Sequence, residues 1–237
     1  MKLIFLILFF VTGGSACQKN NSQTMPSEPS APINEKYTYL ALGDSYTIGE
    51  SVAASENFPN QTITLLNNRS QNFHPARIIA KTGWTMDELE TGIIAANAND
   101  PLLPSYDFVS LLIGVNDQYR GRSVENYKPG FEELLKKAIQ FAGGKADHVI
   151  VLSIPDWGVT PFADGSDRKK IALQIDTYND ANKMIAQEYK VHYIDITPGT
   201  REAANDRSLL AGDGLHPSGK AYKVWAEEMA AIIKSRL

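Results

Sequence analysis

Short apolar runs alternate with longer amphipathic stretches from residue 37 to the last residue of the chain. This alternation is typical of βαβ units, in which helices join parallel strands. Several of the short runs are almost continuous in Val, Ile and Leu, as strands covered by helices on both faces are. The pattern predicts strands at residues 37–42, 76–81, 108–113, 148–154 and 191–196.

The amphipathic stretches between these runs predict five helices. They are expected at residues 58–68, 86–96, 124–141, 168–189 and 217–234. The second of them begins with a capping box, in which Thr85 is the N-cap and Glu88 follows three residues later. The last begins with Pro217, a residue that suits a first helical turn because an N–H group there has no helical partner.

Five strands with helical crossovers predict one α/β domain over residues 37–237. Right-handed crossovers make this domain a three-layer α/β/α sandwich with a five-stranded parallel sheet, in the flavodoxin-like order 2-1-3-4-5. A chain of 237 residues with 43% hydrophobic side chains has enough apolar material for one packed core. In such folds ligands bind beyond the carboxyl ends of the strands, where the order reverses between strands 1 and 3.

The N-terminal residues follow the layout of an export signal. Lys2 precedes an unbroken apolar run at residues 3–11, and small residues follow at 13–16. The apolar run is far shorter than the ~20 residues of a membrane-spanning helix, so we expect no permanent span. We therefore interpret residues 1–17 as an export signal and expect the protein to leave the cytosol.

The single cysteine, Cys17, lies directly after this signal and excludes an intramolecular disulfide. It resembles the lipid-modified cysteine of bacterial lipoproteins, although Gly14 stands where Leu is usual. A lipid anchor at Cys17 would hold the protein on a bacterial envelope membrane. The alternative is ordinary cleavage after Ala16, which would leave a periplasmic or secreted protein. Residues 18–36 are rich in Asn, Ser, Gln and Pro, which predicts a flexible linker.

Charge and residue spacing exclude several partners. The net charge is -4, with 23 basic and 27 acidic residues, and the Lys and Arg residues are scattered along the chain. Nucleic acid is therefore not expected as a partner. No pair of histidines has the spacing of metal ligands, so we expect neither a metal nor a cofactor.

Polar residues and glycines follow the first three predicted strands, with Ser45 after the first, Gly83 after the second and Asn116 after the third. The carboxyl ends of parallel strands share one edge of the sheet, so these residues are expected to meet there. A fourth motif, Asp-Gly-Leu-His-Pro at residues 213–217, precedes the last helix. The long stretch at 197–215 is able to bring it back to the same edge, a distance on the order of 10 Å.

These residue types fit nucleophilic catalysis. A serine hydroxyl attacks an acyl carbon only when a base removes its proton, and His216 is the candidate base for Ser45. Asp213, three residues before the histidine, is the candidate carboxylate that orients the imidazole. The oxyanion of the tetrahedral intermediate needs donors, for which the candidates are the backbone N–H groups of Ser45 and Gly83 and the side-chain amide of Asn116.

In these four motifs the sequence resembles the SGNH hydrolase superfamily, also called the GDSL esterases and lipases. Its four blocks supply Ser, Gly, Asn and His, which match Ser45, Gly83, Asn116 and His216. The resemblance spans the chain from the first strand to the last helix and implies ester hydrolysis through an acyl-serine intermediate. One departure is Tyr46, which replaces the Leu of the namesake motif and bears on the shape of the pocket rather than on the reaction.

Each motif taken alone is also an ordinary turn, and the hydrolase interpretation depends on all four occurring in one order. Two other functions stay open, acyl transfer to a glycan hydroxyl and a non-catalytic binding module on the same fold. The substrate is expected to be a small-molecule, glycan or lipid ester, and the oligomeric state is not predicted. Aromatic and basic residues after the strand ends either line the pocket or cover the core, namely Trp84, Tyr119, Arg120 and Trp157.

Overall fold

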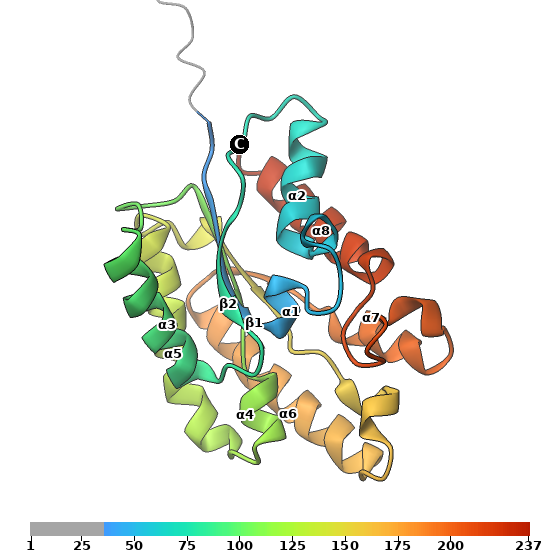
Figure 1. Cartoon of the computed structure of the whole chain (residues 1–237). Coiled ribbons are helices and arrows are strands. Elements are labelled where there is room, and N and C mark those ends of the chain that lie inside the picture. Colours follow the sequence, from blue (N-terminus) through green and yellow to red (C-terminus); the bar gives the residue numbers. More distant parts are fainter. Residues whose placement is uncertain (1–35) are drawn as a thin grey trace, which may run out of the picture. The chain divides into compact units, whose positions relative to one another are not determined.

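Five parallel strands form one sheet in a computed structural model, which describes residues 36–237 (Figure 1). The strands run in the order β2-β1-β3-β4-β5, which confirms the predicted flavodoxin-like order. Their bounds are Tyr39–Asp44 for β1, Arg77–Lys81 for β2, Phe108–Leu112 for β3, Val149–Leu152 for β4 and His192–Ile194 for β5. The predicted export signal, Cys17 and all but the last residue of the predicted linker lie outside the described residues.

Helices cover both faces of this sheet, as Figure 1 shows. One face carries α3 (Met86–Asn99), α5 (Val124–Phe141) and α6 (Arg168–Glu188). The other carries α2 (Phe58–Asn67) and α8 (Gly219–Lys234), which pack against each other. This is the predicted three-layer sandwich. No helix of the part described combines the length and the apolar character that crossing a membrane requires.

The sheet interior explains why the strand sequences are so apolar. All six residues of β1 and all five of β3 are buried, because helices cover both faces. Two polar side chains within the sheet pair with each other. The hydroxyl groups of Tyr39 and Ser110, on adjacent strands, lie 2.7 Å apart and form a hydrogen bond.

The start of the last helix differs from the prediction. Helix α8 begins at Gly219, and its N-cap is Ser218, whose hydroxyl accepts a hydrogen bond from the Ala221 N–H at 3.4 Å. Pro217 lies before the cap and pairs with Leu210 in an isolated antiparallel bridge. The prediction of Pro217 as the first helical residue was wrong because a serine cap satisfies an N–H group of the first turn, which proline does not do.

Short helices that the periodicity did not predict lie at the carboxyl edge of the sheet. Helix α1 (Ser45–Ile48) follows β1 directly, and α4 (Val115–Tyr119) follows β3. The stretch between β5 and α8 is also less irregular than expected, since it contains α7 (Thr197–Arg201) and two 3₁₀ turns. Elements of three to five residues are too short for the hydrophobic period to register, so only the structure reveals them.

Candidate active site

Ser45 is the first residue of α1, and the local sequence makes this turn tight. Asp44 caps the helix, with its Oδ1 accepting a hydrogen bond from the Tyr46 N–H at 3.0 Å. A Cβ at Gly43 would lie 2.1 Å from Thr47 Oγ1 and 2.4 Å from the carbonyl oxygen of Leu112. Glycine is therefore required before the serine, because the helix folds back closely over the end of β1.

Asp213 and His216 are brought together by the turn before α8. The Nδ1 atom of His216 lies 2.6 Å from Asp213 Oδ2, and the other carboxylate oxygen accepts the N–H groups of Leu215 and His216, each at 3.0 Å. Burial raises the pKa of Asp213, but the hydrogen bonds from His216, from these two amides and from Ser51 outweigh it and lower the pKa to about 2. This carboxylate is ionised at neutral pH and holds one nitrogen of the imidazole.

Ser51 is a further member of this group that sequence reasoning missed. Its hydroxyl donates a hydrogen bond to Asp213 Oδ2 at 2.8 Å, across 162 positions of the chain. The Ser51 backbone has a φ of +65°, a left-handed conformation that costs energy in a residue with a side chain. No local sequence signal marks Ser51, because the contact depends on the α8 turn returning to the nucleophile segment.

Gly83 has a left-handed backbone, with a φ of +82°. A Cβ there would meet no atom within 4 Å, so the backbone conformation, rather than a steric limit, requires glycine at this position. Arg120 holds this turn from outside, since its Nη2 donates to the Gly83 carbonyl oxygen at 2.7 Å and also pairs with Glu88 at 3.0 Å. The guanidinium of Arg120 therefore supports the turn that carries the candidate oxyanion donor.

Asn116, in α4, has an amide that is already engaged. Its Nδ2 donates to the carbonyl oxygen of Trp84 at 3.0 Å and to Asp44 Oδ2 at 3.4 Å. Both amide hydrogens are thus directed at protein acceptors, whereas the sequence alone led us to expect a free donor. The contact with Asp44 is long for a hydrogen bond and is the weaker of the two.

Four of the five predicted site residues line one pocket of about 110 Å³ at the carboxyl edge of the sheet. We call it the Ser45 pocket; these four residues are Ser45, Gly83, Asn116 and His216. The fifth, Asp213, does not line the pocket but binds His216 from behind. Ser45 and His216 share the pocket without a hydrogen bond between their side chains, a separation that is common in hydrolases without substrate.

Aromatic side chains form much of the remaining wall. Tyr119 and Trp157 line the Ser45 pocket, which is one of the two roles that the sequence left open for them, and Phe162, which the sequence did not single out, joins them. The rings of Tyr119 and Phe162 lie 5.2 Å and 5.9 Å from Trp157 in edge-on contacts. The indole N–H of Trp157 donates to Gln118 Oε1 at 2.8 Å, which fixes the orientation of the ring.

Trp84 and Arg120, which the sequence also placed after strand ends, support neighbouring parts of the backbone. Trp84 packs its ring against α3, where a Cβ at Gly92 would lie 2.0 Å from it, and its carbonyl holds Asn116. Arg120 supports the Gly83 turn as described above. Neither side chain lines the Ser45 pocket.

Asp44 is a buried carboxyl group beside the pocket. Burial raises its pKa to about 7, against the lowering effect of the Tyr46 N–H, and the nearby charge of Asp117 adds to the rise. Its side chain therefore changes charge near neutral pH. Within residues 36–237 no cluster of three or more His, Cys, Asp or Glu side chains is arranged to hold a metal ion.

The five-stranded parallel sheet in this order, with helices on both faces, is the fold of the GDSL/SGNH hydrolases. Residues 41–224 match the model of the GDSL-like Lipase/Acylhydrolase family, and the chain belongs to this family. No curated protein sequence matches the chain.

Several solved structures share the fold at low identity. The psychrotrophic esterase EstA from Pseudoalteromonas sp. has 18% identity over 84% of this chain and 98% of its own, with a TM-score of 0.62. The acetylxylan esterase Axe2 from Geobacillus stearothermophilus has 20% identity over 83% and 94%, with a TM-score of 0.61. The lipase/acylhydrolase from Enterococcus faecalis has 21% identity over 85% and 97%, with a TM-score of 0.58.

Proposed function

We propose that this protein is a serine esterase that hydrolyses carboxylic esters through an acyl-Ser45 intermediate. The observation that carries the proposal is the gathering of Ser45, Gly83, Asn116 and His216 around one pocket, with Asp213 bound to the imidazole. These residues come from four separate segments of the chain. A scaffold role does not require this combination of nucleophile, base and donors at one place.

In the proposed reaction Ser45 Oγ attacks the ester carbonyl carbon while His216 Nε2 takes the hydroxyl proton. The imidazolium passes this proton to the leaving alcohol oxygen as the ester C–O bond breaks, and Ser45 remains acylated. Water then attacks the acyl group with the same help from His216 and releases the acid. Asp213 keeps Nδ1 in place and stabilises the positive ring in both steps.

The oxyanion of each intermediate would be bound by the backbone N–H groups of Ser45 and Gly83 and by the Asn116 amide. For Asn116 to take part, its long contact with Asp44 must give way to the oxyanion, while its contact with Trp84 keeps the amide in place. The amide needs only a small movement for this exchange, because it already lines the pocket.

The test is ester hydrolysis by the purified full chain. We expect turnover of p-nitrophenyl esters, and a loss of ~10⁶ in kcat for Ser45→Ala and for His216→Ala. Asp213→Asn should lose ~10⁴. Ser105→Ala, at an exposed serine that precedes the amino end of β3, is the matched control and should keep full activity. Absence of Ser45-dependent hydrolysis of p-nitrophenyl esters with short and medium acyl chains would contradict the proposal.

The acyl-enzyme would also be able to transfer its acyl group to a sugar hydroxyl in place of water. Solved neighbours of the same fold include an acetylxylan esterase, which supports a glycan ester as one substrate class to test. Product analysis with a glycan acceptor separates the two reactions, because transfer yields an acylated glycan and hydrolysis yields free acid.

We further propose export of the protein and lipid attachment at Cys17, on the sequence pattern of residues 1–17 alone. Incorporation of labelled palmitate by the natural chain, and its loss in Cys17→Ser, is the expected outcome. A Cys17→Ser protein that is still labelled, or a natural chain that stays in the cytosol, would contradict it.

A further inference from the structure

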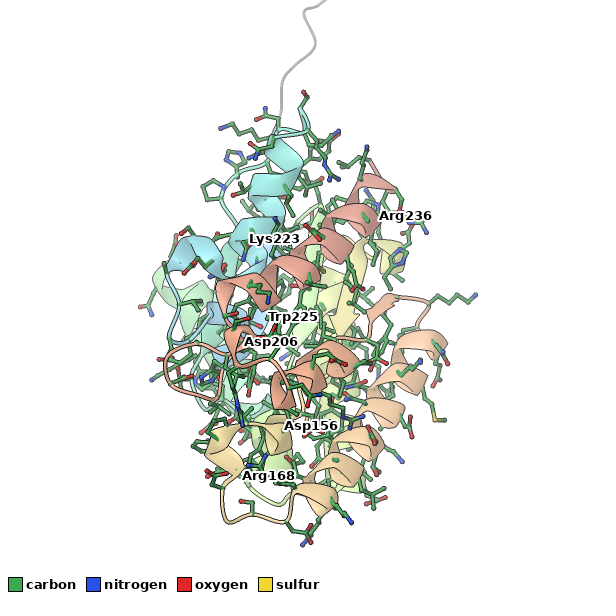
Figure 2. All side chains as sticks on the ribbon, turned by 90° about the vertical axis from the view of Figure 1, so that its right-hand side faces the viewer. Asp156, Arg168, Asp206, Lys223, Trp225 and Arg236 are labelled. Atoms are coloured by element: carbon green, nitrogen blue, oxygen red, sulfur yellow. The ribbon has the colours of Figure 1, made fainter. Side chains whose placement is uncertain are left out.

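A second cavity of about 230 Å³ lies next to the Ser45 pocket. We call it the α8 cavity, because Ala221, Val224 and Trp225 of α8 form one of its walls. Asp156, from the segment after β4, lines it as well, and Figure 2 shows Asp156 and Trp225 on the same face of the molecule. Most of the lining surface is apolar. A cavity of this kind and size suits a bulky apolar group.

Three residues belong to the walls of both cavities, namely Tyr46, Trp157 and Leu215. Tyr46 is the residue that replaces the Leu of the namesake motif, and its ring centroid lies 4.8 Å from that of His216. Because the two cavities share these walls, a substrate bound at Ser45 needs to extend only past these side chains to enter the α8 cavity.

The position of His216 indicates which part of an ester would extend there. Leu215 and Pro217, on either side of the histidine, both line the α8 cavity. The imidazole gives its proton to the leaving alcohol, so the alcohol lies on the histidine side of the reacting carbon. The candidate oxyanion residues Gly83 and Asn116 line the Ser45 pocket and not the α8 cavity.

All the charged residues that line the α8 cavity are acidic. Its lining includes Asp156, Asp195, Glu202 and Glu228, and contains no Lys, Arg or His. Asp156 is neutralised by Arg201, whose Nε lies 2.9 Å from its carboxylate. The other three carboxylates form no ion pair within the described part of the chain. The potential there is negative and disfavours an anionic group.

We propose that the α8 cavity binds the alcohol part of the ester, and that it selects a bulky, apolar alcohol that is neutral or cationic rather than one that carries phosphate or carboxylate. This inference rests on the proposed esterase function of Ser45. Tyr46, Trp157 and Leu215 form the boundary between the alcohol site and the catalytic centre.

The first test changes the size of the cavity. Val224 lines it and is 53% exposed, so Val224→Trp fills the space without disturbing the core. With acetate esters of alcohols of increasing size, we expect about a 10-fold loss of kcat/KM for naphthyl acetate and almost none for ethyl acetate. Ethyl esters of longer acids should be unaffected. The matched control is Lys223→Trp, the adjacent α8 position, which does not line the cavity.

The second test changes the charge. Three phenyl acetates that differ only in a para carboxylate, methyl or trimethylammonium group report the preference for charge. Replacing two carboxylates in Glu202→Gln/Glu228→Gln should raise the rate on the anionic ester relative to the cationic one by about 3- to 10-fold. Glu125→Gln/Glu133→Gln on α5, at the opposite face of the sheet, is the control.

A binding experiment separates this inference from the chemistry. We expect 2-naphthol to bind to the inactive Ser45→Ala protein, measured by calorimetry, and to lose affinity in Ser45→Ala/Val224→Trp. Equal binding to both proteins overturns the inference whether or not Ser45 is catalytic. If the loss of kcat/KM in Val224→Trp depends instead on the length of the acyl chain, the acid part of the ester lies in the cavity. That result would also overturn the inference. If the natural protein hydrolyses no ester but still binds 2-naphthol in the α8 cavity, only the esterase proposal is refuted.

Discussion

Ser51 provides one of the four hydrogen bonds made by the candidate catalytic carboxylate of Asp213. Ser51→Ala removes the hydroxyl that donates to Asp213 but leaves the strained backbone, so we expect kcat/KM to fall about 10-fold, near the lower end of the value of one hydrogen bond to a charged group.

Ser51→Gly provides the matched variant. It loses the same hydroxyl but relieves the left-handed backbone, so it should share the kinetic defect and be about 1 kcal/mol more stable than Ser51→Ala in urea unfolding. Equal kcat/KM of Ser51→Ala and the natural protein would limit Ser51 to a structural role.

Asn116 is predicted to act on the rate rather than on binding. Asn116→Ala removes a donor to the developing oxyanion, so kcat should fall by ~10²- to 10³-fold with little change in KM. Steady-state kinetics on one short ester is the measurement. Because Asn116 also binds the Trp84 carbonyl oxygen, thermal unfolding must show that the variant is folded. A defect confined to KM would exclude the oxyanion role.

At the scale of elements, the turn after β2 is set by the positive φ of Gly83. Gly83→Ala should cost about 1 kcal/mol of unfolding free energy, because alanine is strained in the left-handed region, and should also lower kcat by turning the candidate N–H donor. Gly144 has the same φ of +82° and equally open space, far from the pocket. Gly144→Ala should therefore show the stability cost alone, and similar kinetic losses in both variants would contradict the prediction.

Short elements also decide how the strand ends become a site. Helices α1 and α4 begin within one to three residues of the ends of β1 and β3, and each carries one candidate catalytic residue. Rigid turns of this kind hold Ser45 and Asn116 close to the switch point, where parallel sheets of this order leave room for a ligand.

For the whole molecule, the buried Asp44 couples stability to pH. Its folded pKa of about 7 lies above the ordinary value of about 3.9, so the folded state binds the proton more tightly than the unfolded state. The contribution of Asp44 to stability is therefore greatest below pH 4 and is lost as the pH rises to about 7. Asp117, whose pKa burial raises to about 6, acts in the same direction.

Comparing the natural protein with Asp44→Asn isolates this contribution. Between pH 4.5 and 7.5 the natural protein should lose on the order of 1–4 kcal/mol of unfolding free energy relative to the variant, because only the natural protein must ionise a buried group at position 44. Urea unfolding at several pH values measures it. Parallel stability curves for the two proteins would show that Asp44 is not perturbed by burial.

The periodicity predicted the secondary structure most reliably where elements were long. Helix α5 covers residues 124–141 as predicted, and all five strands were found with ends that moved by a few residues. For α8 the predicted start at Pro217 was wrong. The start of the helix depends on which residue caps its first turn, and that residue is Ser218, whereas Pro217 pairs with Leu210. Hydrophobic spacing carries no information about such end effects.

The sequence by itself determined the strand order and which residues follow each strand end, because right-handed crossovers leave few topologies and parallel strands end at one edge. It therefore placed Ser45, Gly83, Asn116 and His216 near one another. Only the tertiary structure decided that Ser51 binds Asp213, that both hydrogens of the Asn116 amide are occupied, and that Tyr46 lines two adjacent cavities. These features arise from contacts between distant segments, and such contacts leave no trace in a local pattern of apolar and polar residues.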